Sequence, residues 1–357
     1  MFFVVKNNEL LMKNNNKEKI IALLLSGDPT NIELGLTLEK SQAIDLSEFW
    51  DGLSELYRLM YKKKGSRKTW LRLLTIDRVE INNQKISKLP TAIGELVNLE
   101  RLNVDRNLLH GIPEGYLPSQ KLWALSLAQN RFEWLPESIK QLHKLKYLCI
   151  NQNPISALPD WLGQLPELHR FSAYNCRIES IPEGMRHAKM LDWVVFNNNN
   201  LRELPDWISD WYNLEELFVG GNYISELPSS FYKLKKMRRL GLCYNKFKKI
   251  PSRFIEMQAL QDLDLGHNDL SGDVGLIGYL ANLTRLDLDK VGLTRLPMDF
   301  NRLYRLRYLS LANNEIEDLP DWIFECKTLV DLNLEGNPLK RGLKAELKRQ
   351  LPKCRVL

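Results

Sequence analysis

The sequence has few cysteines and histidines, and it lacks the short motifs that mark most enzymes. Its 357 residues include five Cys and five His, with no CxxC pair and no HExxH. These counts exclude a disulfide scaffold and a zinc site of the usual spacing. The patterns GxxxxGK(S/T) and GxSxG are also missing, so neither a phosphate-binding loop nor a serine hydrolase is indicated. We therefore expect no catalytic residue, no cofactor and no metal.

Long apolar runs are missing as well. The run Ile20–Leu25 is far shorter than the roughly 18 apolar residues that a membrane-spanning helix needs. Residues Met1–Leu11 begin with an apolar segment but lack the charged start and the small-residue cleavage site of a secretory signal. We therefore predict no membrane span, a cytoplasmic location and reduced cysteines.

Basic residues are in excess only at the two ends of the chain. The net charge is +6, and residues 1–72 hold 12 Lys/Arg against 9 Asp/Glu, whereas residues 340–357 hold 7 against 1. The long middle of the chain is therefore slightly acidic. A nucleic-acid groove needs a basic stripe along its length, so we predict no nucleic-acid partner.

What the sequence does contain is a repeat of 23 residues, in which an Asn marks the end of the pattern LxxLxLxxN. The Asn markers are Asn107, Asn130, Asn153, Asn199, Asn222, Asn245, Asn268, Asn314 and Asn337, and the same register gives Gln84, Cys176 and Val291. Ten of the twelve repeats also have Pro six residues after the marker. A register held without insertion over this length establishes a repeat array.

Each repeat predicts a short strand followed by a return segment. The alternation xLxLx indicates a strand with its leucines inward, and the return should bury residues such as Trp211 and Phe231. The marker amide can bond backbone groups of the neighbouring repeat, so stacked repeats should form a ladder of amides. Cys176 can fill the marker position as a weakly polar residue. Val291 cannot form a hydrogen bond there, so we expect a weaker rung.

The repeats resemble the leucine-rich repeat family in its 23-residue form, LxxLxLxxNxLxxLPxxIxxLxxL, over about three quarters of the chain. They are similar to the intracellular repeats of Scribble, Erbin, the Ras-suppressor proteins and the bacterial Roco proteins. The resemblance implies an α/β fold, a curved solenoid with a parallel β-sheet on its concave face. It also implies a role in intracellular signalling, with a small GTPase, a kinase or a phosphatase as the partner.

Apolar residues at helical spacing predict a cap at each end of the array. Three helices are expected between residues 17 and 63, and a basic helix over 340–350 should turn Leu343 and Leu347 inward. With both caps present, we expect the array to be complete. The predicted organisation is a flexible N-terminus (1–16), a helical N-terminal cap (17–72), twelve repeats (73–339) and a basic C-terminal capping helix and tail (340–357).

Residues six, four and two positions before each marker should face out of the concave surface. Exposed aromatic and Arg side chains are typical of binding hot spots. The predicted partner-binding residues are Tyr147, Arg170, Tyr174, Trp193, Val195, Phe218 and Arg239. The small residues Ser172, Gly220 and Gly241 are expected to leave room for a side chain of the partner. An alternative is that Tyr174, Trp193 and Phe218 cover one another as a surface cluster.

A secondary acidic patch is predicted on the same face. Its residues are Asp262, Asp264, Asp287 and Asp289. Glu216, Arg239, Asp262 and Arg285 alternate in sign across four strands, which favours an intramolecular salt-bridge ladder. A docking site for a basic partner and a cation site are the alternatives.

These observations predict a non-enzymatic scaffold that binds a partner protein through its concave face. The alternatives are a regulator of a partner enzyme such as a small GTPase, in which Arg170 or Arg239 would supply an arginine to the bound nucleotide, or a host-directed effector. The exposed aromatic patch would serve self-association equally well.

Overall fold

The computed structural model describes residues 16–357, except for residues 27, 113–114, 116, 119–120 and 271–273. The flexible stretch predicted at 1–16 therefore lies, apart from residue 16, outside the described residues. The chain divides into two compact units, Met1–Cys149 and Ile150–Leu357, and each is described by itself. The domain boundaries proposed from the sequence stay predictions.

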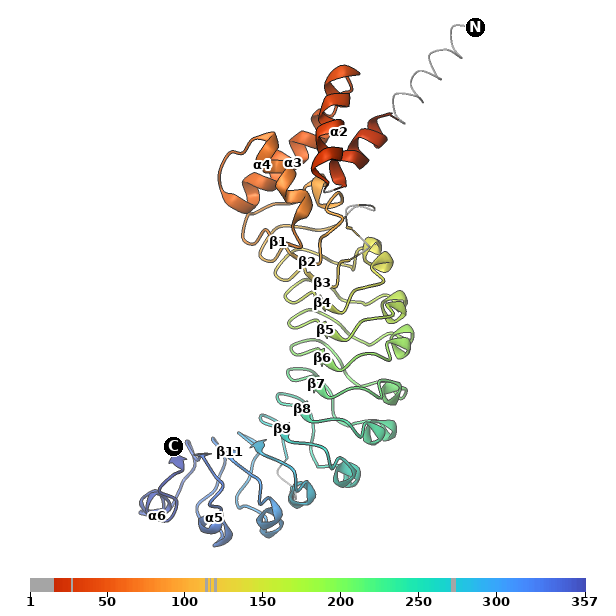
Figure 1. Ribbon diagram of the computed structural model, residues 1–357. Coiled ribbons are helices and arrows are strands. Elements are labelled where there is room, and N and C mark those ends of the chain that lie inside the picture. Colours follow the sequence, from red (N-terminus) through yellow and green to blue (C-terminus); the bar gives the residue numbers. More distant parts are fainter. Residues whose placement is uncertain (1–15, 27, 113–114, 116, 119–120, 271–273) are drawn as a thin grey trace. The chain divides into compact units, whose positions relative to one another are not determined.

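Helices begin the first unit (Figure 1). Residues 16–25 are helical, and α2 (Pro29–Ser41), α3 (Ser47–Tyr61) and α4 (Arg67–Leu71) follow. Asp28 starts α2 because its carboxylate Oδ1 accepts from the backbone N–H groups of Thr30 at 2.8 Å and Asn31 at 3.0 Å. On α3, Leu53 and Leu56 are fully buried. The helix packs against the turn η2 (Thr91–Ile93) of the first repeat, so it closes that end of the unit.

Four parallel strands follow in the first unit, each paired with the next at a spacing of 23 residues. They are β1 (Arg78–Glu80), β2 (Arg101–Asn103), β3 (Ala124–Ser126) and β4 (Tyr147–Cys149). After η1 (Arg72–Thr75), the 3₁₀ turns found in the return segments among the described residues of this unit are η2 and η3 (Glu137–Gln141).

The second unit continues the pattern, with each strand parallel to its sequence neighbour. Its strands are β5 (Arg170–Ser172), β6 (Trp193–Val195), β7 (Glu216–Phe218), β8 (Arg239–Gly241), β9 (Asp262–Asp264), β10 (Arg285–Asp287), β11 (Tyr308–Ser310), β12 (Asp331–Asn333) and β13 (Arg355–Val356). Within this unit the strands line the inner side of an arc (Figure 1).

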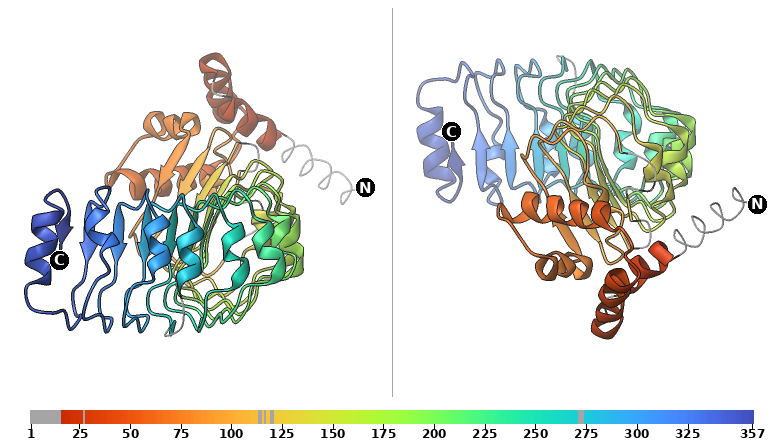
Figure 2. Two further views of the ribbon diagram at one scale, coloured as in Figure 1. Left: turned by 90° about the horizontal axis from the view of Figure 1, so that it is seen from below. Right: turned by 90° about the horizontal axis from the view of Figure 1, so that it is seen from above.

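Short helical turns form the outer side of the second unit. They are η4 (Asp160–Gln164), η5 (Glu183–His187), η6 (Ile208–Asp210), η7 (Ser229–Lys233), η8 (Ser252–Glu256), η9 (Gly275–Tyr279), η10 (Met298–Arg302) and α5 (Trp322–Glu325). Trp211 and Phe231 are fully buried, as predicted for the return segments. The helix α6 (Leu343–Gln350) covers the last repeat with Leu343 and Leu347 buried (Figure 2).

The marker asparagines form the predicted ladder. Asn222 is typical: its Nδ2 donates to the carbonyls of Phe196 and Val219, each at 2.9 Å, and its Oδ1 accepts from the N–H of Leu201 at 3.0 Å. The side chain thus ties its own strand end to the preceding repeat. Val291 has no side-chain amide and so donates no such bonds, although its backbone N–H donates to Asn314 Oδ1 at 3.0 Å.

A second ladder, of backbone conformation, runs beside the first. The residue before each marker is left-handed, with φ between 51° and 58° at the ten non-glycine positions. The row is Asn83, Arg106, Gln129, Gln152, Asn175, Asn198, Gly221, Tyr244, His267, Lys290, Asn313 and Gly336. A single left-handed residue turns the chain sharply out of the strand, so the marker amide points inward.

Both units therefore have the strand-and-turn solenoid architecture with helical caps that the sequence predicts. Two elements were not predicted, namely the short helix α4 and the final strand β13. The closing helix begins at Leu343 instead of Lys340, after Gly342 in a left-handed conformation. None of the helices in the described part of the chain has the length and apolarity needed to cross a bilayer.

Candidate functional site

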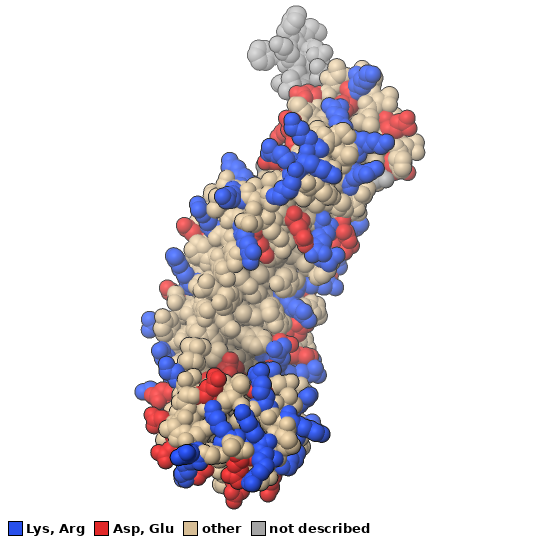
Figure 3. All heavy atoms as spheres, turned by 90° about the vertical axis from the view of Figure 1, so that its left-hand side faces the viewer, with Lys and Arg blue, Asp and Glu red and all other residues tan. Residues whose placement is uncertain are grey.

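The parallel register arranges side chains of the second unit in two rows on the strand face. The central row is Ser172, Val195, Phe218, Gly241, Asp264, Asp287, Ser310 and Asn333. The outer row is Arg170, Trp193, Glu216, Arg239, Asp262, Arg285, Tyr308 and Asp331. Along this unit, largely uncharged surface gives way to charged side chains of both signs toward the C-terminal end (Figure 3).

The predicted aromatic residues of this unit lie where the sequence placed them. Trp193 and Val195 on β6, and Phe218 on β7, are half-buried, so each keeps an accessible part. Tyr174 follows β5 and its hydroxyl accepts from Asn198 Nδ2 at 3.3 Å. Among the described residues, no ring pair joins Tyr174, Trp193 and Phe218. Stacking on one another therefore does not account for their accessible surface.

The expectation that glycines leave room for a partner is wrong at Gly220 and Gly241. A Cβ at Gly241 would lie 2.9 Å from Cδ1 of Phe218, and one at Gly220 would lie 2.7 Å from Sγ of Cys243. Neighbouring side chains of the protein itself thus occupy the space above both glycines. The absence of a side chain at Gly241 leaves room for the Phe218 ring, whose Cδ1 and Cε1 lie 2.9 Å and 3.7 Å from the position that a Cβ there would take.

The outer row contains the predicted salt-bridge ladder. Arg239 bridges Glu216 at 3.1 Å and Asp262 at 3.6 Å, and Arg285 lies 3.7 Å from the same Asp262 carboxylate. The Arg239 guanidinium also lies 5.5 Å from the centroid of the Phe218 ring. Reaching a partner's nucleotide would require Arg239 to leave these contacts, so it is a poor candidate for a supplied arginine.

Arg170 is held much more loosely than Arg239. Its Nε lies 3.7 Å from Asp192, and its side chain is 64% exposed. A weak ion pair at such exposure contributes little to stability and leaves the guanidinium available. Arg170 therefore lies beside Trp193 and places an accessible positive charge at the edge of the apolar surface.

The central row turns acidic at β9 and β10. A Cβ at Gly266 would lie 3.0 Å from Oδ1 of Asp287 and 3.4 Å from Oδ1 of Asp264, so both carboxylates converge over this glycine. The N–H of Gly266 donates to Asp264 at 3.0 Å and the N–H of Asp289 to Asp287 at 2.9 Å. Asp289 instead accepts from Ser310 Oγ and from the N–H of Ala312.

The convergence of these carboxylates changes their acidity. Burial, and then the charges of Asp264 and Asp289, raise the pKa of Asp287 to about 7. Burial also raises the pKa of Asp264, against the hydrogen bonds that lower it. Among the described residues, no group of three or more His, Cys, Asp or Glu side chains is arranged to hold a metal ion. The predicted acidic patch thus divides into Asp262, which is paired with arginines, and an Asp264–Asp287 pair.

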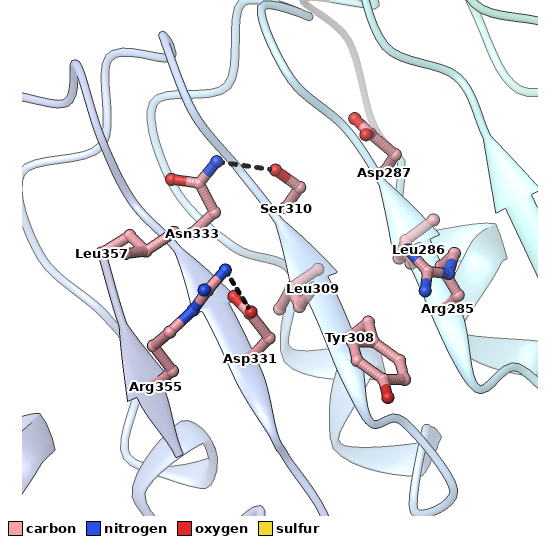
Figure 4. A pocket seen from close by; sticks show the side chains of 10 residues that line it. All are labelled: Arg285, Leu286, Asp287, Tyr308, Leu309, Ser310, Asp331, Asn333, Arg355 and Leu357. Carbon is pink, nitrogen blue, oxygen red and sulfur yellow. Dashed lines mark hydrogen bonds and ion pairs between the residues drawn. The ribbon is translucent and has the colours of Figure 1, made fainter.

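A hollow of about 230 Å³ at the C-terminal end of the strand face went unrecognised in the sequence (Figure 4). Arg355 points toward Asp331, with the two groups 2.8 Å apart, and Asn333 Nδ2 donates to Ser310 Oγ at 3.2 Å. The Arg285 guanidinium lies 4.5 Å from the centroid of the Tyr308 ring. The repeat register supplies all of these residues except Arg355, which belongs to the strand β13 beyond the last marker.

Tyr147 belongs to the first unit and is described apart from the other predicted residues. It lies on β4 and lines a hollow of about 140 Å³ together with Arg78 and Arg101. The Arg101 guanidinium lies 5.8 Å from the centroid of the Trp123 ring. The structure brings Tyr147 to the strand face of its own unit, as the repeat register predicts.

The comparisons with known proteins agree with this architecture. The leucine rich repeat family matches residues 213–270 and 281–339. A leucine-rich repeat protein of Leptospira interrogans is similar at 27% identity and a TM-score of 0.69, covering 82% of this chain and 86% of that one. An internalin of Listeria monocytogenes, InlF, covers 85% and 94% at 18% identity and a TM-score of 0.66, and shows the fold alone.

A plant receptor extends the comparison to a bound ligand. The plant peptide hormone receptor RGFR1, solved in complex with RGF2, is 27% identical with a TM-score of 0.56. The alignment covers 72% of this chain and 47% of the receptor chain. Among curated proteins, no match to the sequence was found. Family and structural matches together support a leucine-rich repeat protein with the predicted solenoid fold, and a fold of this kind suggests a protein-binding module.

Proposed function

We propose that the chain is a non-enzymatic scaffold that binds a partner protein through the strand face of its second unit. The observation that carries the proposal is the apolar surface formed by Trp193, Val195 and Phe218, whose accessible parts face outward from paired strands. Large apolar groups that remain accessible on a rigid surface are typical of interaction sites. Because the strands are fixed by the repeat ladder, binding would cost the scaffold little conformational entropy.

We propose further that the partner belongs to intracellular signalling and that the chain acts in the cytoplasm. The likeness of its repeats to those of Scribble, Erbin, the Ras-suppressor proteins and the Roco proteins supports this proposal. A small GTPase, a kinase or a phosphatase is the partner class it favours. The receptor RGFR1, solved with RGF2, supports ligand binding by this fold in general.

An affinity pull-down tests the proposed surface. The wild type and a Trp193→Ala/Phe218→Ala double variant are used as bait in lysate of the source cell, and retained proteins are identified by mass spectrometry. Truncating two central anchors should weaken binding by about 2 kcal/mol or more, which is at least about thirtyfold in affinity. The expected result is a partner that the wild type retains and the double variant loses.

The matched control is Trp134→Ala, which removes an indole that is 60% exposed in the first unit. Circular dichroism and a thermal melt establish that all three proteins are folded. Retention of the same partners by the double variant would show that the strand face of the second unit is not the binding surface.

A further inference from the structure

We propose that the partner presents an extended segment in which an Arg or Lys follows or precedes an apolar side chain by four residues. The apolar side chain would lie on Trp193, Val195 and Phe218, and the cation between Asp264 and Asp287. The inference rests on the proposed function and names the chemistry of its partner.

The central row contains both the apolar part and the acidic part of this proposed site. The pairing runs from Val195 to Phe218 to Gly241, and on to Asp264 and Asp287, without a break in register. Neighbouring strands are about 4.8 Å apart, so the two carboxylates lie roughly 10 and 14 Å from Phe218 along the row. An extended chain advances about 3.3 Å per residue and its side chains alternate between its two faces, so a separation of four residues spans about 13 Å and turns both side chains toward the strand face.

The charge of the row favours a cation at its acidic end. Asp262 and Glu216 in the outer row are each paired with an Arg of the same chain. Within the described residues, by contrast, Asp264 and Asp287 form no ion pair with a Lys or Arg, and they accept only from backbone N–H groups and the Cys243 thiol. A partner cation would relieve the repulsion between the two carboxylates.

The geometry fits a guanidinium or an ammonium group better than a bare metal ion. Gly266 contributes no side chain, and the two Oδ1 atoms lie 3.0 Å and 3.4 Å from the position that a Cβ there would take. The third carboxylate, Asp289, is turned away toward Ser310 and Ala312. Two carboxylates that converge from neighbouring strands match the forked donors of Arg, and each such charge-assisted hydrogen bond is strong.

Synthetic peptides test the inference directly. The probes are fluorescein-labelled twelve-residue Gly/Ser peptides that carry one Phe and one Arg, separated by one to six residues, with Glu replacing Arg in a companion set. Fluorescence anisotropy measures their affinity for the full chain. We expect the Phe–Arg peptides with Arg four positions from Phe to bind about tenfold more tightly than their Phe–Glu companions, as a charge-assisted contact of this kind would give.

Two charge-matched variants locate the effect. At pH 8, above the pKa of about 7 of Asp287, Asp264→Asn/Asp287→Asn should abolish the preference for Arg, whereas Asp269→Asn/Glu315→Gln removes a similar charge from exposed positions off the central row and should preserve it. If Arg and Glu peptides bind equally and Trp193→Ala/Phe218→Ala loses both, the cation inference is wrong while the proposed function stands.

Other outcomes overturn the inference as well. Lack of binding by every peptide would show that this face does not take an extended segment, and the pull-down would then decide the proposed function separately. Sedimentation of the wild type distinguishes a second copy as the occupant. A dimer that Asp264→Asn/Asp287→Asn dissociates would mean that a copy of this chain, and not another protein, covers the face.

Discussion

Each marker asparagine supplies hydrogen bonds that the end of its strand needs. Asn245 illustrates the pattern, because its Nδ2 donates to Val219 of the preceding repeat at 2.9 Å and to Leu242 of its own strand at 3.0 Å. An amide is suited to this position because it donates and accepts at once. At Cys176 the thiol lies 3.4 Å from the carbonyl of Ile150 and makes a weaker contact of the same kind.

Restoring the missing amide should therefore stabilise the protein. In Val291→Asn, the new Nδ2 would reach the carbonyl of Leu265 in the preceding repeat and that of Leu288 at the end of its own strand, which are the equivalents of the two carbonyls that Asn222 binds. We expect the free energy of unfolding to rise by about 1 kcal/mol, measured by urea denaturation. The reciprocal change, Asn222→Val, should lower it by about 2 to 3 kcal/mol, because buried carbonyls lose their donor. Equal stability of Val291→Asn and the wild type would contradict the ladder's energetic role.

The acidity of Asp287 makes stability depend on pH. Its pKa is raised from 3.8 to about 7, so folding favours the protonated form. The stabilising contribution is therefore complete below about pH 4 and is lost as the pH rises toward 7. Above pH 7, Asp287→Asn should be more stable than the wild type by roughly 1 to 2 kcal/mol, a value reduced for solvent screening at this half-buried site.

The measurement is urea denaturation at pH 4, 6 and 8. Asp287→Asn should show a flatter dependence on pH than the wild type, and the two proteins should be similar at pH 4. Asp269→Asn, an exposed position, serves as the control. An unchanged pH dependence in Asp287→Asn would show that burial and the charges of Asp264 and Asp289 do not raise the pKa of this carboxyl group in the folded protein.

At the scale of elements, α6 protects the edge of the last repeats. Leu347 is fully buried on this helix, and β13 pairs with β12 immediately after it. In Leu347→Asp, a charge would have to be buried or the helix would have to detach, so we expect a loss of about 3 kcal/mol. Lys348→Asp changes the neighbouring exposed residue and should have little effect.

The loss in Leu347→Asp should be local, which hydrogen exchange can detect. The N–H of Leu357 donates to Leu332 and that of Leu334 to Leu357, so these amides should lose protection first. We expect protection at β12 to fall by about tenfold or more while β6 and β7 keep theirs, since each repeat contacts mainly its neighbours. A uniform loss of protection over the second unit would contradict this expectation.

The elements that follow the 23-residue register could be predicted from the sequence, and those that depart from it could not. Strands β1 to β12 each lie a fixed number of residues before a marker in the sequence. Arg355 on β13 pairs with Asp331 at a spacing of 24, after α6 has interrupted the repeat. The helix α4 depends on a local capping box between Ser66 and Thr69 and has no apolar periodicity to reveal it.

At the site, the sequence predicts which residues lie on the strand face but not how their side chains are oriented. The register placed Trp193, Val195 and Phe218 on the strand face, but it gave no direction for the Phe218 ring, which lies along Gly241. The left-handed row was also missed. Six of its twelve residues are Asn or Gly, and the others, such as Tyr244 and His267, hide the signal. Those two rings stack 3.8 Å apart, a contact that no periodic pattern specifies.

For the molecule as a whole, the repeat separates stability from recognition. The inward leucines and the marker amides fix the strands, whereas the outer and central rows of the second unit differ from strand to strand in charge and size. A substitution such as Phe218→Ala on the strand face removes surface without breaking a ladder bond. The pull-down and peptide variants can therefore change binding while the solenoid stays folded.

The amide ladder also has a consequence for how the chain reaches this structure. Marker asparagines such as Asn222 and Asn245 bond to groups 21 and 26 residues away. The entropy of closing a loop depends on its length, so every repeat added to a growing stack closes a loop of the same modest size. Folding of such a chain therefore requires few closures of long loops. We expect it to spread from any early pair of repeats to the neighbouring repeats, with a nearly constant entropy cost for each repeat added.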